Sequence, residues 1–525
     1  MEVNGAGNTV LYRGALKSCN YHCSYCPFSK HRVSENELKR DREQWFRFCH
    51  SLINQADSKR VRAVMIVPYG EALIHPWYWK GLAELSQSPH LDAVGAQTNL
   101  SFLLEKALEE YRQAGGILPH LRLWATFHPE MISAEAFAEA CHKVREAGIL
   151  LCAGAVGVPH HIKQLQTLKK RLPKDVYFWI NKLDGRRRPY TKEEEQEFLE
   201  IDPFFYRELR LVSANPHLCQ NRFFVEGDGR YRACNISSPM GKGWYQQENQ
   251  LSNPNIQCRQ KFCSCYLAYG GRQDFMNSVL FGPYPVFRIP RRPKAVFLDI
   301  DETLIPEKGG RVSNLVAEDL AALAKSGETY LLFATTLPYQ EAIHRCRKLC
   351  HLFHGGIFSA GAHMRLEGSV VLDTGEKAGK KEAFCFFDGA KLLPFFEQQK
   401  RNYHFRILVY QKGSDIYKIS LIRSARMPWP PDQAQAVFQY ALENSSVKGL
   451  RFFTEGHCMQ ILAKQANKAN GAGILCKWLG ISRDDVAAAG NSEEDQELLA
   501  RWNGFYVGVG KAKSTRVGIE NGNVC

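Results

Sequence analysis

The chain has 525 residues, more than a single hydrophobic core serves, so two or three domains are expected. Its content of 45% hydrophobic and 23% charged residues is ordinary for a globular protein. No apolar run approaches the ~20 residues of a membrane helix, and the start lacks the basic and apolar regions of a signal peptide. We therefore expect a cytoplasmic protein that does not associate with a membrane.

The formal net charge of +14 fits either a nucleic-acid partner or a small anionic substrate, and charge alone does not choose between them. Seventeen cysteines are spread through a long chain without an export signal. Thiols and metal ligands are therefore expected in place of disulfides.

The first part of the chain alternates short apolar runs with segments of helical spacing. This order predicts a parallel sheet curled like part of a (β/α)6 barrel over residues 1–210. In such folds the chemistry gathers at the carboxyl ends of the strands. The predicted strands are 9–13, 61–67, 92–97, 121–127, 149–156 and 176–180.

Three cysteines, Cys19, Cys23 and Cys26, follow the first predicted strand. Three thiolates can hold three irons of a four-iron cluster and leave the fourth iron open to an external ligand. The alternatives are a structural zinc site or core cysteines. A closed zinc site needs four protein ligands, which favours the cluster.

With Tyr69-Gly-Glu-Ala72, this triad resembles the radical S-adenosylmethionine (SAM) superfamily over about residues 8–270. The resemblance implies a 4Fe-4S cluster that binds SAM, reductive cleavage to a 5′-deoxyadenosyl radical, and an electron donor such as flavodoxin or ferredoxin. Tyr69 departs from the family pattern, where a glycine is usual. The SAM-binding residues implied are Tyr25, Gly70 and Glu71, with Thr98, Asn99 and Gly157 as weaker matches.

Five further cysteines lie in an expected cysteine-rich extension, residues 211–281. They are Cys219, Cys234, Cys258, Cys263 and Cys265. Residues 225–234 read as a hairpin that turns at Gly-Asp-Gly. The layout is similar to the auxiliary iron–sulfur domains of some radical SAM enzymes, and zinc is the alternative. Four ligands would fill a second cluster, so one cysteine is left unassigned.

A linker rich in proline and arginine, residues 282–294, precedes the second half of the chain. The run 295–301 predicts a buried strand that ends in Asp299 and Asp301. One carboxylate can attack phosphorus while the other handles protons, and a divalent cation would offset their charge. A second apolar strand ends at Thr335, and a third leads to 490–495.

This order resembles the haloacid dehalogenase (HAD) superfamily over about residues 294–525, a Rossmann-like domain with a large α+β cap, here about 364–455. The resemblance implies a phosphatase with Mg2+. Asp299 is then the nucleophile and Asp301 the general acid/base, and Thr335 and Lys468 hold the phosphoryl group, with Lys464 as the alternative lysine. The implied metal ligands are Asp299, Asp301, Asn491 and Asp495. Asn491 departs from the family pattern, which usually has Asp there.

The leading hypothesis is a bifunctional enzyme that modifies a small phosphorylated metabolite, a sugar or a nucleotide, by radical chemistry and hydrolyses its phosphate ester. The cysteine group keeps a peptide- or protein-modifying enzyme open. The net charge keeps an RNA-modifying or RNA-end-processing protein open.

Overall fold

The computed structural model describes the greater part of the chain. The described residues are 8–26, 32–54, 61–185, 188–209, 212–213, 222–241, 243–245, 261–263, 267, 275–305, 312, 314–325, 329–367 and 379–507. The chain divides into two compact units, one up to Arg291 and one from Arg292 on. This boundary falls inside the segment that the sequence marks as a linker.

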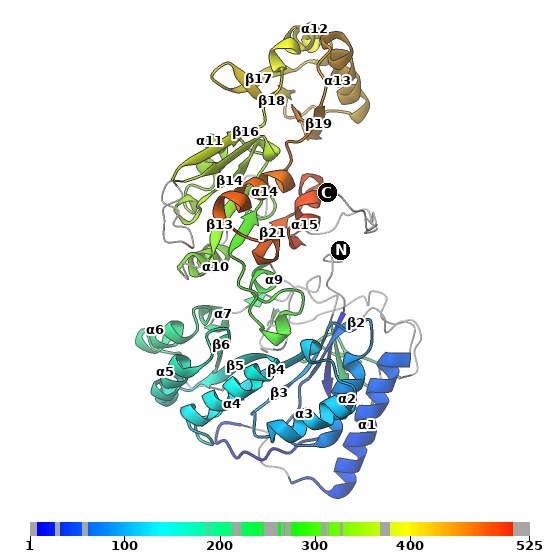
Figure 1. Ribbon diagram of the computed structural model, residues 1–525, viewed down its shortest axis with the longest axis vertical. Helices are drawn as coiled ribbons and strands as arrows, with labels where there is room; N and C mark the ends of the chain where they lie inside the picture. Colours follow the sequence, from blue (N-terminus) through cyan, green and yellow to red (C-terminus); the bar gives the residue numbers. More distant parts are fainter. Residues whose placement is uncertain are drawn as a thin grey trace. The chain divides into compact units, whose positions relative to one another are not determined.

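The first unit is built on a nine-stranded sheet of order β10-β9-β8-β1-β2-β3-β4-β5-β6 (Figure 1). Neighbours from β1 to β6 are parallel. All six strands lie within two residues of their predicted bounds. They are β1 (Asn8–Arg13), β2 (Val61–Ile66), β3 (Ala93–Thr98), β4 (Leu121–Phe127), β5 (Leu150–Gly157) and β6 (Phe178–Lys182).

A helix follows each of these strands, as the alternating pattern predicts. They are α1 (Glu35–Asn54), α2 (Pro76–Ser86), α3 (Leu104–Gln113), α4 (Ala134–Glu146), α5 (Ile162–Arg171) and α6 (Lys192–Ile201). Their apolar faces bury large side chains such as Trp45, Tyr111 and Phe137 against the sheet. Burial of this continuous apolar surface stabilises the unit.

The sheet continues beyond β1 through β8 (Arg222–Glu226), which is parallel to it. β9 (Tyr231–Arg232) and β10 (Pro239–Gly241) add antiparallel strands. The predicted hairpin at 225–234 is confirmed by the β8–β9 pair. Four short elements complete the unit: α7 (Tyr206–Leu209), β7 (Val212–Ser213), β11 (Phe262–Cys263) and α9 (Phe275–Phe281). The strand order is that of a (β/α)6 unit, while curling into a partial barrel and the cysteine-rich extension stay predictions.

The second unit has a seven-stranded sheet of order β16-β15-β14-β13-β12-β21-β22. Five strands are parallel: β12 (Ala295–Leu298), β13 (Tyr330–Ala334), β14 (Gly355–Phe358), β21 (Val486–Gly490) and β22 (Gly504–Tyr506). Two antiparallel strands, β15 (His363–Leu366) and β16 (Lys381–Phe384), extend one edge. The helices are α10 (Asn314–Lys325), α11 (Tyr339–Arg345), α14 (Lys468–Leu479) and α15 (Gln496–Arg501).

A smaller antiparallel sheet of order β17-β18-β20-β19 forms the cap, with its own apolar core. Its elements are α12 (Leu393–Tyr403), β17 (Arg406–Lys412), β18 (Asp415–Ile422), α13 (Pro431–Ser445), β19 (Leu450–Glu455) and β20 (Cys458–Ala463). The expected cap, 364–455, differs at both ends, because β16 joins the larger sheet and β20 the smaller one. An apolar strand pattern does not state which sheet the strand joins.

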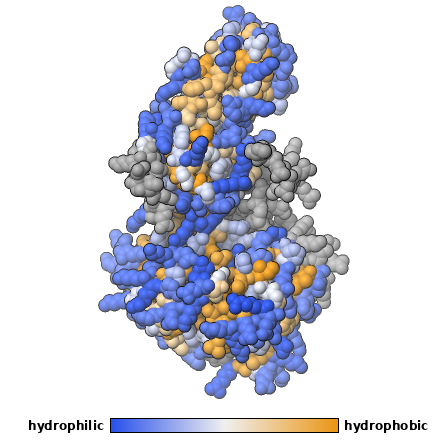
Figure 2. Space-filling model, viewed as in Figure 1, coloured by the Kyte–Doolittle hydropathy of each residue, from blue (hydrophilic) through white to orange (hydrophobic). Residues whose placement is uncertain are grey.

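Within the described ranges, no helix combines the length and apolar character needed to cross a bilayer. The face drawn in Figure 2 is largely hydrophilic, with smaller apolar areas between the polar ones.

Candidate phosphoryl-transfer site and cysteine site

Three parallel strand ends bring the predicted phosphatase residues together. β12 lies between β13 and β21, so Asp299, Thr335 and Asn491 leave the same edge of the sheet. The Asp299 amide donates a hydrogen bond to the carbonyl of Ala489 at 3.0 Å. Polar side chains at adjoining carboxyl ends of parallel strands are the usual way an α/β sheet builds a binding site.

Lys468, the first residue of α14, joins two carboxylates at this edge. Its Nζ donates to Oδ1 of Asp299 at 3.0 Å and to Oδ1 of Asp495 at 2.6 Å. All three side chains are buried. Burial raises the pKa of Asp299, and the Lys468 ammonium opposes that shift. Burial lowers the pKa of Lys468, but the two carboxylates outweigh it and raise the pKa, so this ammonium stays charged.

The geometry separates the two candidate lysines. Lys464 is exposed before the helix begins, whereas Lys468 is 1% exposed and contacts the proposed nucleophile. Thr335 is also buried, and its hydroxyl accepts a hydrogen bond from the Leu337 amide at 3.2 Å. Thr335 is therefore held at the end of β13, and Lys468 is held at the start of α14 against Asp299.

Asp301 is the second carboxylate after β12, and its side chain is half-exposed. Arg345, the last residue of α11, contacts its Oδ1 through Nε at 2.8 Å and through a terminal nitrogen at 2.6 Å. Both contacts use the same oxygen, Oδ1. The chain turns sharply directly after Asp301, because Glu302 has a left-handed backbone conformation with a φ of 59°. Arg345 is a residue that the sequence analysis missed.

The predicted magnesium ligands differ in how accessible their oxygens are. Asp495 is fully buried, and its Oδ2 accepts from the amides of Asn491 and Ser492 and from the Ser492 hydroxyl. This network gives Asp495 a positioning role on the loop after β21. Asn491 is half-buried, and its Oδ1 accepts from the Thr303 hydroxyl at 3.2 Å. Carboxylate and amide oxygens suit Mg2+, and Asp299, Asp301 and Asn491 can supply them.

The cap contributes polar side chains that the sequence analysis also missed. Glu455 accepts from the Thr336 hydroxyl at 3.2 Å and from Nε2 of Gln460 at 2.9 Å. Lys418 donates from Nζ to the Thr336 carbonyl at 3.1 Å and is 2% exposed. Burial lowers the pKa of Lys418 to about 8. The sequence signal that could have identified Lys418 is its place inside an otherwise apolar strand, β18.

A family profile described as haloacid dehalogenase-like hydrolase matches residues 396–516. This stretch begins in the cap and includes Lys468, Asn491 and Asp495. Residues 396–516 are therefore similar to a haloacid dehalogenase-like hydrolase domain.

Solved structures similar to this chain are also HAD proteins. A HAD subclass IIB sugar phosphatase is 14% identical over 40% of this chain and 86% of its own, with a TM-score of 0.31. A HAD-like hydrolase from B. subtilis is 15% identical over 40% and 88%, with a TM-score of 0.30. One from Bacteroides thetaiotaomicron is 15% identical over 40% and 85%, with a TM-score of 0.31. No curated protein sequence matches the chain.

The cysteine triad lies on the loop after β1, at the carboxyl edge of the first sheet. Burial raises the pKa of Cys23 to about 11, and the neighbouring Cys26 and Cys19 thiols add to that shift. The sulfur atoms of Cys19, Cys23 and Cys26 do not all lie within 4.8 Å of one another.

Glu71 lies beside this loop in a hydrogen-bond network. Its Oε1 accepts from the Leu73 amide at 3.0 Å and the Thr98 hydroxyl at 2.9 Å, and its Oε2 accepts from the Asn99 amide at 2.6 Å. Nδ2 of Asn99 approaches the Cys19 sulfur at 3.9 Å. Burial raises the pKa of Glu71 to about 7, against these three donors. The structure therefore brings these four predicted residues together.

Tyr25 lies on the cysteine loop, and Gly70 lies against Ser18 and Cys19 of that loop. Gly157 is the last residue of β5. The Tyr25 hydroxyl lies 2.9 Å from Nδ1 of His128. The Gly157 carbonyl accepts from the Tyr190 hydroxyl at 2.7 Å. Of the second cysteine group, Cys234 and Cys263 are buried in one apolar cluster. Cys219, Cys258 and Cys265 lie outside the described residues, so this group's ligands stay predictions.

Proposed function

We propose that the chain is a bifunctional enzyme that joins Mg2+-dependent phosphate ester hydrolysis to radical SAM chemistry on a small phosphorylated metabolite. The observation that carries the proposal is Lys468, buried between Asp299 and Asp495 at adjoining strand ends. The HAD match supports the phosphatase half. The cysteine loop with Glu71, Thr98 and Asn99 beside it supports the radical half.

In the phosphatase half, a carboxylate oxygen of Asp299 attacks phosphorus and forms an aspartyl-phosphate as the ester oxygen leaves. Asp301 gives that oxygen a proton and then takes one from the attacking water. Lys468 and Thr335 hold the phosphoryl oxygens. Mg2+ would offset the charge of the phosphate, with Asp299, Asp301 and Asn491 as its protein ligands.

In the radical half, Cys19, Cys23 and Cys26 would hold a 4Fe-4S cluster, which with bound SAM supplies the one-electron chemistry. Glu71 has lone-pair capacity left on its oxygens and would orient the amino group of SAM. Asn99 would hold the loop through Asn20, whose Oδ1 accepts from its side chain at 3.1 Å. An external electron donor, flavodoxin or ferredoxin, would reduce the cluster.

The test of the phosphatase half is covalent trapping at Asp299. The full chain is mixed with acetyl phosphate and Mg2+, quenched in acid, and mapped by mass spectrometry. We expect phosphate on the peptide that contains Asp299, and none after Asp299→Asn. Asp484→Asn is the matched control, because Asp484 is exposed outside the site. Trapped phosphate that persists in Asp299→Asn would remove this mechanism.

A further inference from the structure

Three potential metal ligands lie at the carboxyl edge of the first sheet and take no part in the proposed reactions. Glu130 lies in the loop after β4, and His160 and His161 lie in a short 3-10 helix, Pro159–His161, after β5. β4 and β5 are neighbouring parallel strands, so both segments leave the same edge. One ligand atom from each of the three residues lies within 4.8 Å of the other two.

We propose that Glu130, His160 and His161 bind a divalent transition-metal ion, separate from the cysteine cluster and from the magnesium site. Two imidazoles and one carboxylate are a ligand set for Zn2+ or Fe2+, and they leave coordination positions open. Bonds of about 2.0–2.2 Å allow ligand atoms up to about 4.4 Å apart. Nε2 of His161 lies 4.0 Å from Oε1 of Glu130. His160 is exposed, so its side chain can rotate the remaining distance.

His161 supplies a second observation that points to a ligand. Its ring is 5% exposed, and its Nδ1 is buried without a hydrogen-bond partner among the described residues. Its Nε2 approaches Glu130 only at 4.0 Å. Neither ring nitrogen therefore has a hydrogen bond among the described residues, and an ion bound at Nε2 would give the ring a polar bond and place the N–H on Nδ1.

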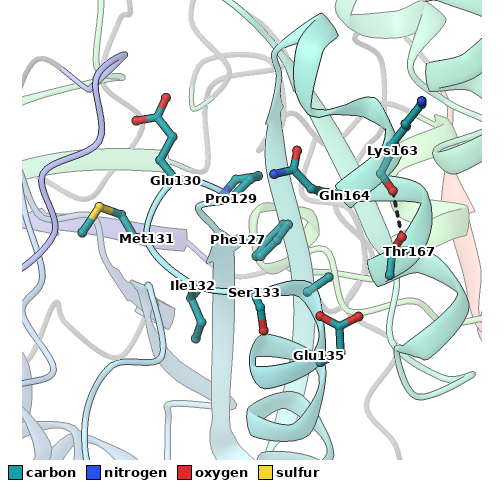
Figure 3. A pocket seen from close by; sticks show the side chains of 11 residues that line it. Phe127, Pro129, Glu130, Met131, Ile132, Ser133, Glu135, Lys163, Gln164 and Thr167 are labelled. Carbon is teal, nitrogen blue, oxygen red and sulfur yellow. Dashed lines mark hydrogen bonds between the residues drawn. The ribbon is translucent and has the colours of Figure 1, made fainter.

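The proposed site is attached to the cysteine loop. Oε2 of Glu130 accepts from the Ser24 amide and Oε1 from the Ser24 hydroxyl, both at 2.6 Å. The Tyr25 ring lies 6.2 Å from the His161 ring. The ion would therefore fix the loops after β4 and β5 to the segment between Cys23 and Cys26. Glu130 also lines the pocket drawn in Figure 3, in which its carboxylate points away from Phe127 and Glu135.

The test is Co2+ binding to the metal-stripped full chain, followed by absorption and metal analysis. We expect the wild type to bind one more Co2+ than His161→Gln, in a form without thiolate-to-cobalt charge transfer. Glu130→Gln should weaken that ion's binding at least about tenfold. His50→Gln is the matched control, because His50 is exposed on α1 outside the cluster, and it should bind Co2+ as the wild type does.

Two results would overturn the site. One is equal Co2+ content in the wild type, His161→Gln and Glu130→Gln. The other is loss of the same ion from a chain carrying Cys19→Ser, Cys23→Ser and Cys26→Ser, which would assign it to the thiols. Glu130→Gln changes an exposed side chain, so it keeps the test decisive if His161→Gln fails to fold. Circular dichroism verifies the fold of each variant.

Discussion

Gly70 is the residue at which the cysteine loop meets the end of β2. A Cβ built on it would lie 1.7 Å from the carbonyl oxygen of Ser18, which is backbone and cannot turn away. The Glu71 amide donates to the same oxygen at 3.1 Å. The resemblance to radical SAM proteins predicts Gly70 at the SAM site. The structure adds a packing reason for glycine that no local pattern shows.

Gly70→Ala should therefore displace the cysteine loop. We expect a loss of unfolding free energy larger than the about 1 kcal/mol of a typical substitution, measured by urea denaturation, together with reduced iron binding. Gly473→Ala, in α14, is the control. Its Cβ would meet only a Trp502 atom at 3.6 Å, so it should be neutral or stabilise by up to about 1 kcal/mol. Equal effects of the two changes would refute the close-approach argument.

Lys418 gives a prediction of pH-dependent stability. Burial lowers its pKa to about 8 from the usual 10.5. Between these values the unfolded chain binds more protons than the folded one, so stability rises with pH across that window. Between pH 8 and 10.5, the unfolding free energy of the wild type should rise by on the order of 3 kcal/mol relative to that of Lys418→Met. Thermal melting at a series of pH values measures this change. The change Lys448→Met, at an exposed position, should produce no such pH-dependent difference from the wild type. A stability difference between the wild type and Lys418→Met that does not vary with pH would contradict the lowered pKa of Lys418.

At the scale of elements, the sequence predicts what strand ends carry, because an apolar run and its polar end are local patterns. Asp299 and Thr335 follow from such patterns, whereas Lys468, the first residue of a helix, follows from the resemblance to HAD proteins. The structure brings Lys468 to Asp299 at the edge of the sheet. Arg345 and Glu455 do not follow from local patterns. Arg345 ends a helix and Glu455 comes from the cap, and their approach to the site depends on packing between distant segments.

The loop after β21 makes a prediction about metal affinity. Asn491 offers a neutral amide oxygen where Asp would add charge to the ligand set. Asn491→Asp should lower the Mg2+ concentration that gives half-maximal phosphate release. Asn444→Asp, at an exposed position of α13, should leave that concentration unchanged. A higher Mg2+ requirement in Asn491→Asp would contradict a role for residue 491 as a metal ligand. It would mean that repulsion between the new carboxylate and Glu302, which now accepts a hydrogen bond from Asn491, outweighs any gain in Mg2+ binding.

At the scale of the whole molecule, the two units have separate sheets and separate apolar cores. The parallel order of β1 to β6 was readable from sequence because each strand–helix unit is local. The sheets that β16 and β20 join could not be predicted, because an apolar strand pattern does not state the strand's pairing partner.

The most direct measurement follows both products from one protein. The full chain is reconstituted anaerobically with iron and sulfide, given dithionite, SAM, Mg2+ and a phosphate ester, and assayed for 5′-deoxyadenosine and free phosphate. We expect Cys23→Ala to lose 5′-deoxyadenosine and keep phosphate release, and Asp299→Asn to do the reverse. Cys350→Ala, outside both sites, should keep both. Phosphate release lost with Cys23→Ala, or no 5′-deoxyadenosine from the wild type with its cluster in place, would contradict two reaction centres in one chain.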